Sequence, residues 1–366
     1  MKIAVPRERA AGETRAALVP EGVSRLTRGG HDVLVEAGSG EAAGFPDAAY
    51  GEAGASLLPA APDVWAGADV VVKVQPPSPE EAARLGSGRA LVCFLHPAQN
   101  RDLLRDLAAR GVTGFAVDAL PRITRAQPMD ALSAMSTVAG YKAALLAAGH
   151  LGKFFPMLMT AAGTIPPARV LVIGAGVAGL QAIATTRRLG AQVEAFDTRP
   201  AAKEEVKSLG AAFVDVDLGE GGQDRAGYAV ELSEAAKQRQ REALRDRVAR
   251  ADAVITTALV PGRPAPRIVT AEMVRGMPKG SVIVDLAAPA GGNCELTRPG
   301  ETAVAHGVTI LGPLNLPALL PNPASRMLSR NFVALVEHLF AKGAPDLSDE
   351  ITRACCVIHA GEARAP

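Results

Sequence analysis

The sequence predicts an α/β protein made of two doubly wound parallel-sheet domains separated by a cleft and joined by long helices. Short apolar, β-branched runs alternate with amphipathic stretches from residue 1 to about residue 120, and the same alternation begins again near residue 169. The chain has 366 residues, of which 48% are hydrophobic. That length and composition can supply two hydrophobic cores.

The first domain is predicted from five strands and the helices between them. We expect the strands at residues 2–6, 31–36, 69–74, 90–95 and 112–117. The helices, the first of which ends at the Gly29-Gly30 break, are expected at residues 20–28, 80–85 and 103–110. Because strands and helices alternate, this sheet should be parallel.

The second domain is predicted from six strands that follow a long apolar connecting helix at residues 136–151. The strands, as many as a complete dinucleotide-binding domain contains, are expected at residues 170–173, 192–197, 212–216, 253–256, 282–286 and 308–311. A helix at residues 329–342 and the tail after it should pack back onto the first domain. We therefore expect one domain of residues 1–135 plus 322–366 and another of residues 136–321.

A glycine turn follows the first strand of the second domain. Gly174, Gly176 and Gly179 have the spacing G-x-G-x-x-G between a strand and a helix. The first glycine permits a tight turn, the second lets backbone N–H groups approach a pyrophosphate, and the third allows the helix to pack closely on the strand. Asp197 ends the next strand, where an acid hydrogen-bonds the adenosine ribose of NAD. These features together predict a Rossmann-like dinucleotide site rather than a merely structural turn.

Composition argues against several classes of protein. The 39 basic and 38 acidic residues give a net charge of +1 and form no basic block, so no nucleic-acid or anionic-membrane surface is expected. The four cysteines have neither zinc-ligand spacing nor the density of a disulfide scaffold, so we expect no metal site and a reducing, cytoplasmic compartment. We expect no signal peptide, because the N-terminus is a charged, strand-like segment without an apolar core. We also expect no membrane span, because the apolar stretch at residues 143–167 is interrupted by polar residues and prolines.

Four polar or glycine-rich segments could carry chemistry, at residues 122–133, 219–229, 256–266 and 285–295. The first lies where the chain passes between domains, a favoured place for ligands, although Asp130 or Ser133 could equally cap the following helix. The second can be a lid or an exposed connector, and Gln240 in the helix beyond it is expected at the surface. The last two follow strand ends, where ligands bind in open α/β sheets, but simple turns explain their glycines nearly as well.

Arg15, Lys73 and His96 stand singly outside the nucleotide domain. A histidine can exchange protons near neutral pH, and lysine and arginine can hold a carboxylate. Taken alone, each of the three is expected to be structural.

Five segments, taken in order, resemble one known family. They read RITRAQPMDALS from residue 122, PMLMTAAGTIPPARV from residue 156, GAGVAGLQAIA from residue 174, TTALVPGRPAP from residue 256 and DLAAPAGGNCELT from residue 285. Together they resemble the NAD(H)-binding first domain of the proton-translocating NAD(P) transhydrogenases, with a match that runs to about Asn315 and is less clear beyond. Alanine dehydrogenase shares the same fold.

The resemblance implies roles for the residues before the connecting helix. Arg122, Gln127, Asp130 and Ser133 match the loop that holds the nicotinamide and faces a second nucleotide. Pro128 stands where the family commonly has a serine, which could stiffen this loop.

The resemblance also implies roles in the nucleotide domain. Ala175, Gly176 and Val177 match the pyrophosphate turn, Asp197, Thr198 and Arg199 the ribose-binding strand end, Gly227 and Tyr228 a mobile loop that closes over the nucleotide, and Gln240 and Leu259 further contacts. Arg199 could accept a 2′-phosphate, but Asp197 would repel it, which favours NAD over NADP.

Alanine dehydrogenase is the alternative. This chain keeps Arg15, Lys73 and His96 where that enzyme has its pyruvate-binding and acid–base groups. The catalytic aspartate of that enzyme, however, falls at Pro289, which can neither ionise nor exchange a proton. Residues 122–133 and 227–229 resemble transhydrogenase alone.

The resemblance therefore implies hydride transfer between NADH on this chain and NADP⁺ on a partner subunit, coupled to proton translocation. The sequence has one dinucleotide fingerprint. We expect an alpha-type subunit, a homodimer, that is cytoplasmic and docks on inner-membrane subunits carrying the NADP site and the proton channel. An alanine-dehydrogenase-like amino-acid oxidoreductase and a non-catalytic nucleotide sensor remain the alternatives.

Overall fold

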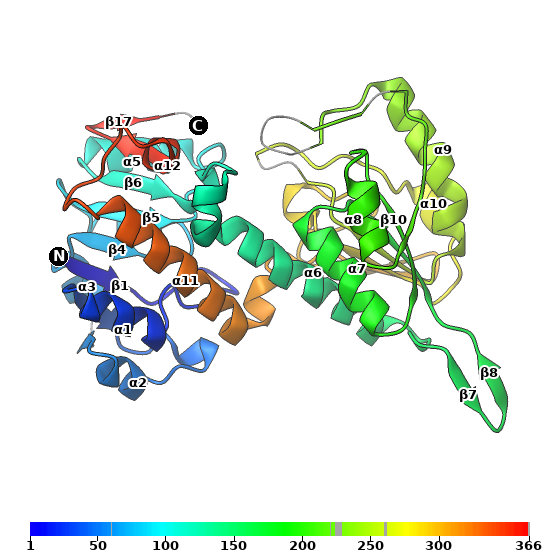
Figure 1. Cartoon of the computed structure of the whole chain (residues 1–366), viewed down its shortest axis with the longest axis horizontal. Helices are drawn as coiled ribbons and strands as arrows, with labels where there is room; N and C mark the ends of the chain where they lie inside the picture. The colour runs from blue at the N-terminus through cyan, green and yellow to red at the C-terminus, as the bar shows by residue number, and fades with distance from the viewer. Residues whose placement is uncertain (60, 220, 224–228, 260–261, 365–366) are drawn as a thin grey trace. The chain divides into compact units, whose positions relative to one another are not determined.

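The computed structural model describes residues 1–59, 61–219, 221–223, 229–259 and 262–364. The chain divides into two compact units: unit 1 comprises Met1–Met135 and Pro317–Pro366, and unit 2 comprises Ser136–Leu316. Each unit contains a sheet of mainly parallel strands with helices packed on it (Figure 1). The predicted class, two Rossmann-like α/β domains, is confirmed.

Unit 1 contains an eight-stranded sheet in the order β17-β16-β6-β5-β4-β1-β2-β3. Its parallel strands are β1 (Lys2–Val5), β2 (Asp32–Glu36), β3 (Ser56–Leu58), β4 (Val70–Val72), β5 (Ala90–Cys93) and β6 (Thr113–Ala116). The tail of the chain adds two antiparallel strands beside β6, namely β16 (Cys356–His359) and β17 (Glu362–Ala363). Strand β3 was not predicted, because its three residues are largely exposed and show no alternation.

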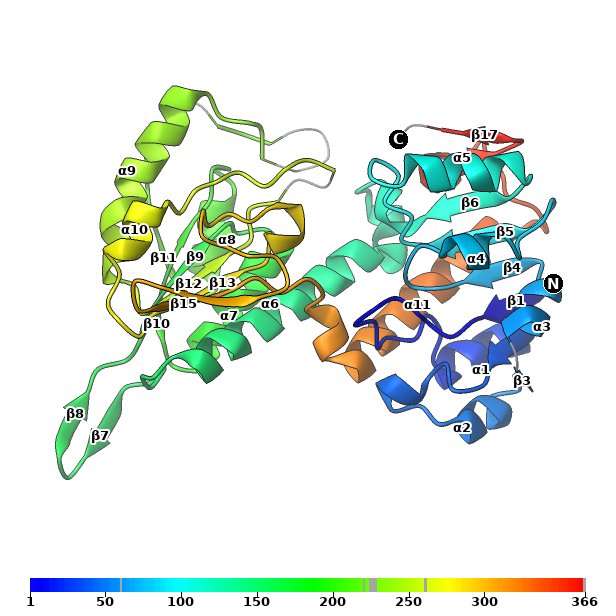
Figure 2. The same cartoon turned by 180° about the vertical axis from the view of Figure 1, so that it is seen from behind.

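The helices of unit 1 cover both faces of this sheet. They are α1 (Pro20–Arg28), α2 (Asp47–Glu52), α3 (Ala61–Ala66), α4 (Pro79–Ala82), α5 (Arg101–Ala109), α11 (Pro321–Leu339) and α12 (Glu350–Cys355), with 3₁₀ turns η1 (Glu41–Ala43), η2 (Val117–Ala119), η3 (Thr124–Met129) and η5 (Pro317–Leu319). Helices α3, α4 and α5 share one core, where Trp65 and Leu107 are buried, and α4 and α5 lie in front in Figure 2. Helix α11 crosses the opposite face (Figure 1). It begins at Pro321, earlier than predicted, because prolines are tolerated in a first helical turn.

Unit 2 contains a seven-stranded sheet in the order β11-β10-β9-β12-β13-β15-β14, with the strand order of a dinucleotide-binding domain and one added edge strand. The strands are β9 (Arg169–Ile173), β10 (Gln192–Phe196), β11 (Ala212–Phe213), β12 (Ala253–Thr256), β13 (Val282–Asp285), β14 (Thr302–Ala305) and β15 (Val308–Leu311), of which β14 is antiparallel. All six predicted strands are present, and the edge strand β14 is the addition to them.

Two hydrophobic cores cover the two faces of the unit 2 sheet. Helices α6 (Ala131–His150), α7 (Val177–Arg188) and α8 (Ala202–Ser208) contribute to one core, and α9 (Glu234–Arg250) and α10 (Ala271–Arg275) to the other. Strand β9 contributes to both cores. Val170 and Val172 belong to the first core, whereas Leu171 and Ile173 belong to the second. Alternate residues of a strand point to opposite faces, so a strand buried on both sides is apolar throughout.

Helix α6 bears on the expectation that no segment spans a membrane. Within the described ranges it is the one helix long and apolar enough, by length and composition, to cross a membrane, and core helices of soluble proteins meet the same criterion. Ala143, Ala144 and Ala147 are completely buried in a core of unit 2. A Cβ atom on Gly140 would lie 2.0 Å from the carbonyl oxygen of Ala178 in α7. Close packing explains these small, buried residues of the helix, of whose apolar window 39% is buried. The helix begins before the stretch at residues 143–167 on which the expectation rests.

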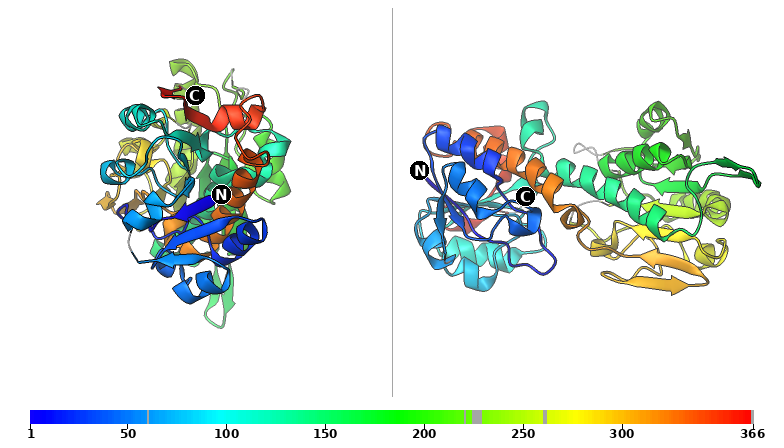
Figure 3. Two further views of the ribbon diagram at one scale, coloured as in Figure 1. Left: turned by 90° about the vertical axis from the view of Figure 1, so that its left-hand side faces the viewer. Right: turned by 90° about the horizontal axis from the view of Figure 1, so that it is seen from below.

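A separate two-stranded hairpin projects from the body of unit 2 (Figure 3). It consists of β7 (Leu158–Thr160) and β8 (Gly163–Ile165). It carries exposed apolar side chains, since Met159 is 82% exposed, and Met157 just before β7 is 56% exposed. In the sequence this stretch looks like part of one apolar region, and the hairpin was not predicted.

Candidate nucleotide site and transfer loop

The glycine turn of unit 2 is built by close packing of its first and third glycines. Gly174 follows β9 with φ of 96°, a conformation that favours glycine, and a Cβ atom there would lie 2.7 Å from Thr257 Oγ1. A Cβ atom on Gly179 would lie 1.8 Å from the carbonyl oxygen of Gly174. The Thr257 hydroxyl donates a hydrogen bond to that same carbonyl oxygen at 2.9 Å. Both glycines are therefore needed for the turn itself.

Gly176 differs from the other two glycines. A Cβ atom at this position would meet no heavy atom within 4 Å. Gly176 is also the N-cap of α7, so it offers no side chain to the N–H groups of the first turn. A helix N-terminus with unshielded N–H groups and open space before it can bind an anion such as a phosphate.

Asp197 ties the end of β10 to this turn. Its Oδ2 atom accepts a hydrogen bond from the backbone N–H of Ala175 at 2.7 Å, and its Oδ1 atom accepts one from the backbone N–H of Arg199 at 2.8 Å. The guanidinium of Arg199 binds both carboxylate oxygens, with Nε and Nη2 at 2.9 Å. The pair is largely buried, and these hydrogen bonds raise the pKa of Arg199. The acid predicted to bind ribose thus lies beside the glycine turn.

A cavity of about 580 Å³ adjoins this carboxylate. It is lined by both charged and apolar groups, including Asp197, Arg199, Lys203, Phe213 and Leu218. Lys203 Nζ contacts both carboxylate oxygens of Asp215 at 2.7 and 2.9 Å in the same wall. A cavity with an apolar wall and a hydrogen-bonding carboxylate at the carboxyl ends of parallel strands can hold an adenosine.

The glycine-rich segment 219–229 begins against the same strand end. Gly221 approaches Thr198 so closely that a Cβ atom would lie 2.7 Å from the Thr198 carbonyl oxygen. Gly227 and Tyr228, predicted to close over a nucleotide, lie outside the described residues.

Gln240 and Leu259, which are predicted to contact the nucleotide, differ in how far they are buried. Gln240 is buried, with 6% exposed, which corrects the expectation that it lies at the surface. It shares the inward face of α9 with Leu244, a pattern that spacing along the helix could have revealed. Leu259 is 41% exposed.

The segments after β12 and β13 are joined by two buried polar side chains. Asp285 accepts hydrogen bonds from Thr256 and Thr297 side chains at 2.9 and 2.6 Å and from two backbone N–H groups. Asn293 exchanges hydrogen bonds with the backbone of Ala258 and also donates to the Pro266 carbonyl oxygen. Both side chains are fully occupied in holding the loops, so their role in this unit is structural.

The predicted transfer loop lies in unit 1 and is mostly the 3₁₀ turn η3. Gln127 is exposed, whereas its neighbours Ala126 and Met129 are buried. Asp130 precedes α6, and its Oδ1 atom accepts a hydrogen bond from the backbone N–H of Ser133 at 2.8 Å. Asp130 therefore does cap the helix, as the structural alternative proposed. Arg122 is exposed.

Comparison with known proteins shows the family to which the chain belongs. The family model of the N-terminal domain of alanine dehydrogenase/PNT matches residues 4–139, and that of the C-terminal domain matches residues 143–366. The chain belongs to the alanine dehydrogenase/PNT family.

Within the alanine dehydrogenase/PNT family the chain is 44% identical to NAD(P) transhydrogenase subunit alpha of Cereibacter sphaeroides, over 100% of this chain and 71% of that protein. It is 33% identical to the alanine dehydrogenase of Mycolicibacterium smegmatis, over 94% of this chain and 88% of that enzyme. The solved structure of transhydrogenase from Sinorhizobium meliloti covers 99% of this chain and all of its own with a TM-score of 0.91 at 42% identity. The predicted resemblance is confirmed, with alanine dehydrogenase as the more distant relative.

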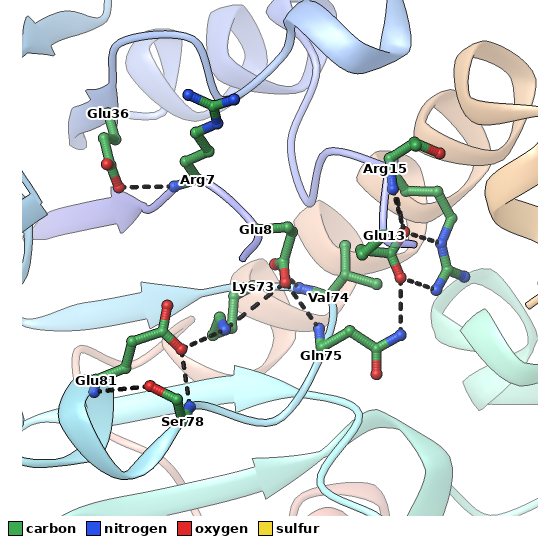
Figure 4. A network of polar contacts seen from close by, with 11 residues as sticks. Arg7, Glu8, Glu13, Arg15, Glu36, Lys73, Val74, Gln75, Ser78 and Glu81 are labelled. Carbon is green, nitrogen blue, oxygen red and sulfur yellow. Dashed lines mark hydrogen bonds and ion pairs between the residues drawn. The ribbon is translucent and has the colours of Figure 1, made fainter. Parts of the chain in front are cut away.

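The residues that suggested an alanine dehydrogenase lie in unit 1, where internal carboxylates neutralise two of them (Figure 4). Arg15 binds Glu13 through Nε at 2.7 Å and through Nη2 at 2.5 Å. Lys73 lies 2.9 Å from Glu81 and 3.6 Å from Glu8. All of these side chains are buried, so an incoming carboxylate would have to displace an internal one.

His96 differs from the other two. Its Nδ1 atom lies 3.4 Å from Asp118, and 39% of its side chain is exposed.

Pro289 lies in the 3₁₀ turn η4 (Ala288–Ala290) and is exposed. Among the described residues no group of three His, Cys, Asp or Glu side chains could hold a metal ion.

The buried glutamates have opposite pKa shifts. Burial alone would raise the pKa of Glu13, but the hydrogen bonds and charge of Arg15 outweigh it and lower the pKa to about 2. Burial raises the pKa of Glu8 to about 6, although Lys73 opposes the shift. The network therefore holds Glu13 ionised while favouring a proton on Glu8 in mildly acidic solution.

Glu13→Gln tests the contribution of this network to stability. Because the folded-state pKa of Glu13 is depressed, its stabilisation is present above the unfolded value near 4.5 and is lost as pH falls towards 2. The shift corresponds to a contribution on the order of 3 kcal/mol. We expect the variant to be less stable than the parent at pH 7, with a difference that narrows as pH falls below 4.5, measured by urea unfolding. Asp102→Asn, which removes an exposed ion pair with Arg105, is the control and should change little. A difference that stays constant with pH would contradict the assignment.

Proposed function

We propose that this chain is the NAD(H)-binding alpha subunit of a proton-translocating NAD(P) transhydrogenase. The observation that carries the proposal is an intact glycine turn tied to Asp197, combined with Pro289 at the position of the alanine dehydrogenase acid. The higher identity to a named alpha subunit supports the same assignment. The reaction is then hydride transfer between NADH on this chain and NADP⁺ on a partner subunit. It requires no acid–base step on a substrate.

In this proposal the nucleotide lies along the carboxyl ends of the unit 2 strands. Ala175, Gly176 and Val177 bind the pyrophosphate, Asp197, Thr198 and Arg199 the adenosine ribose, and Gln240, Leu259, Gly227 and Tyr228 make further contacts. The open backbone at Gly176 and the cavity beside Asp197 support these roles.

The paired charges of Asp197 and Arg199 support NAD rather than NADP. The guanidinium is already neutralised by a bidentate carboxylate, so little positive charge is available for a 2′-phosphate. A phosphate entering here would also meet Asp197 at close range. NADP is then left to the partner subunit.

The transfer loop, residues 122–133, is proposed to orient the nicotinamide. We propose that Arg122, Asp130 and Ser133 orient the nicotinamide and that Gln127, which is exposed, reaches towards the second nucleotide. The bound nicotinamides carry the hydride chemistry. The contribution of the loop is to hold the reacting rings at near-attack distance and to exclude water.

The proposed partners are a second copy of this chain and membrane subunits that carry the NADP site and the proton channel. The hairpin β7–β8 supports a homodimer, because an isolated two-stranded hairpin with exposed methionines is only marginally stable in water. The chain would then be cytoplasmic and held at the inner membrane by its partners. Analytical ultracentrifugation of the purified chain tests the dimer.

The purified chain tests the assignment against alanine dehydrogenase. We expect it to bind NADH in a calorimetric titration and to show no oxidation of NADH with pyruvate and ammonia, because Pro289 cannot transfer a proton. Measurable reductive amination of pyruvate would contradict the proposal.

Asp197→Asn tests nucleotide choice. The variant removes the carboxylate that repels a 2′-phosphate and releases the guanidinium of Arg199. We expect the preference for NADH over NADPH, measured as a ratio of Kd values, to shrink by about tenfold, the effect of about 1.4 kcal/mol. Glu194→Gln, which removes an exposed carboxylate from the same strand, should leave the ratio unchanged. An unaltered ratio in Asp197→Asn would remove Asp197 from the discrimination.

Gln127→Asn tests positioning in the loop. Shortening the side chain by one methylene should leave the Kd for NADH within about twofold and slow hydride transfer in the complex by about tenfold or more, because misplacement affects the transition state more than binding. Stopped-flow absorbance with the NADP-binding subunit present measures the rate. Gln238→Asn, an equivalent change on the exposed face of α9, is the control. Equal rates for Gln127→Asn and the parent would exclude Gln127 from the mechanism.

A further inference from the structure

The transfer loop is fixed at two places to the C-terminal segment of unit 1. Arg125 Nη2 lies 2.7 Å from Asp349 Oδ2. Asn331 Nδ2, from α11, donates a hydrogen bond to the carbonyl oxygen of Pro128 at 2.8 Å. Residues 331 and 128 are 203 positions apart in the sequence, so folding of the C-terminal segment onto the N-terminal one creates this contact.

Asp349 is itself firmly held. It is the N-cap of α12, where its Oδ1 atom accepts hydrogen bonds from the backbone N–H groups of Ile351 and Thr352 at 2.9 and 3.1 Å. His338 Nε2, from α11, lies 2.9 Å from the same oxygen. Burial would raise the pKa of Asp349, but these hydrogen bonds and Arg125 hold it well below its usual range. The loop is therefore bound to an ionised acceptor whose position two helices define.

The two contacts flank Gln127 in the sequence. Arg125 is held on one side of it and the carbonyl group of Pro128 on the other. Ala126 and Met129 are buried, with 1% and 7% exposed. A backbone fixed at these neighbouring positions sets the direction in which the side chain of Gln127 leaves the loop, and such preorganisation is what a positioning group requires.

We propose that Asp349 and Asn331 are positioning residues for hydride transfer, acting through Arg125 and the Pro128 carbonyl group to hold the backbone of Gln127 in place. This inference rests on the proposed function, which gives the loop its role at the nicotinamides. The proline at position 128 adds to the effect, because its ring fixes the backbone φ angle beside Gln127.

The test uses substitutions that spare the fold. Asp349→Asn keeps an oxygen for capping α12, since asparagine caps as well as aspartate, but removes the charge that holds Arg125. Arg125→Met removes the other partner. In the complex with the NADP-binding subunit, we expect each variant to transfer hydride about tenfold more slowly, with the Kd for NADH changed by less than about twofold. The double variant should be no slower than either single one, because both remove the same interaction.

Glu337→Gln is the matched control. It breaks the ion pair of Glu337 with Arg25, which also joins α11 to another element and does not involve the loop. We expect its transfer rate to equal that of the parent. Hydrogen exchange should be faster at residues 124–130 in Asp349→Asn and unchanged in the β1, β4 and β5 strands.

The outcomes separate the two proposals. Variants that transfer hydride as fast as the parent would overturn the positioning role while leaving the proposed function intact. Variants that lose transfer rate, NADH affinity and protection from hydrogen exchange throughout unit 1 would also overturn the positioning role. Such a combined loss marks a general structural role for these residues. A parent complex that binds both nucleotides but transfers no hydride would overturn the proposed function and this inference with it.

Discussion

The hydrogen bonds of the Asp197 carboxylate are the interactions on which the candidate nucleotide site depends. The carboxylate joins the end of β10 to the glycine turn through the backbone N–H of Ala175 and holds the guanidinium of Arg199, which lines the adjoining cavity. The turn needs this support because its glycines give it no side chains of its own. Gly174 and Gly179 are there so that backbone can touch backbone, and Gly176 leaves the space that a phosphate needs.

Carboxylates at strand ends recur in both units. Asp285 collects two hydroxyls and two backbone N–H groups after β13. Asp118 accepts from the backbone N–H groups of Leu95 and His96 after β5, and Glu8 from those of Val74 and Gln75 after β4. Loops at the carboxyl ends of parallel strands carry N–H groups that the sheet no longer pairs, and an acid beside them satisfies several at once. These carboxylates therefore fix the backbone that follows these strand ends without help from a ligand.

Much of the fold and the glycine turn could be predicted from the sequence because the signals are local. The order strand, G-x-G-x-x-G, helix, strand, Asp197 lies within residues 169–197, and each of the six parallel strands of the unit 2 sheet has an apolar run. What could not be predicted depends on contacts between distant segments. Nothing near Arg125 indicates Asp349, and nothing near Pro128 indicates Asn331. Gln240 was expected at the surface because glutamine usually lies there, although the helical spacing to Leu244 indicates a buried face. The hairpin β7–β8 escaped prediction because its exposed methionines resemble core residues.

In the proposed function, this chain supplies one half of a hydride-transfer site. The most direct measurement is the rate of hydride transfer from NADH to an NADP⁺ analogue when the purified chain is mixed with the NADP-binding subunit. Rapid transfer in the mixture, with none by either protein alone, is the result that the account predicts. Transfer by this chain alone, or none in a mixture that binds both nucleotides, would contradict it.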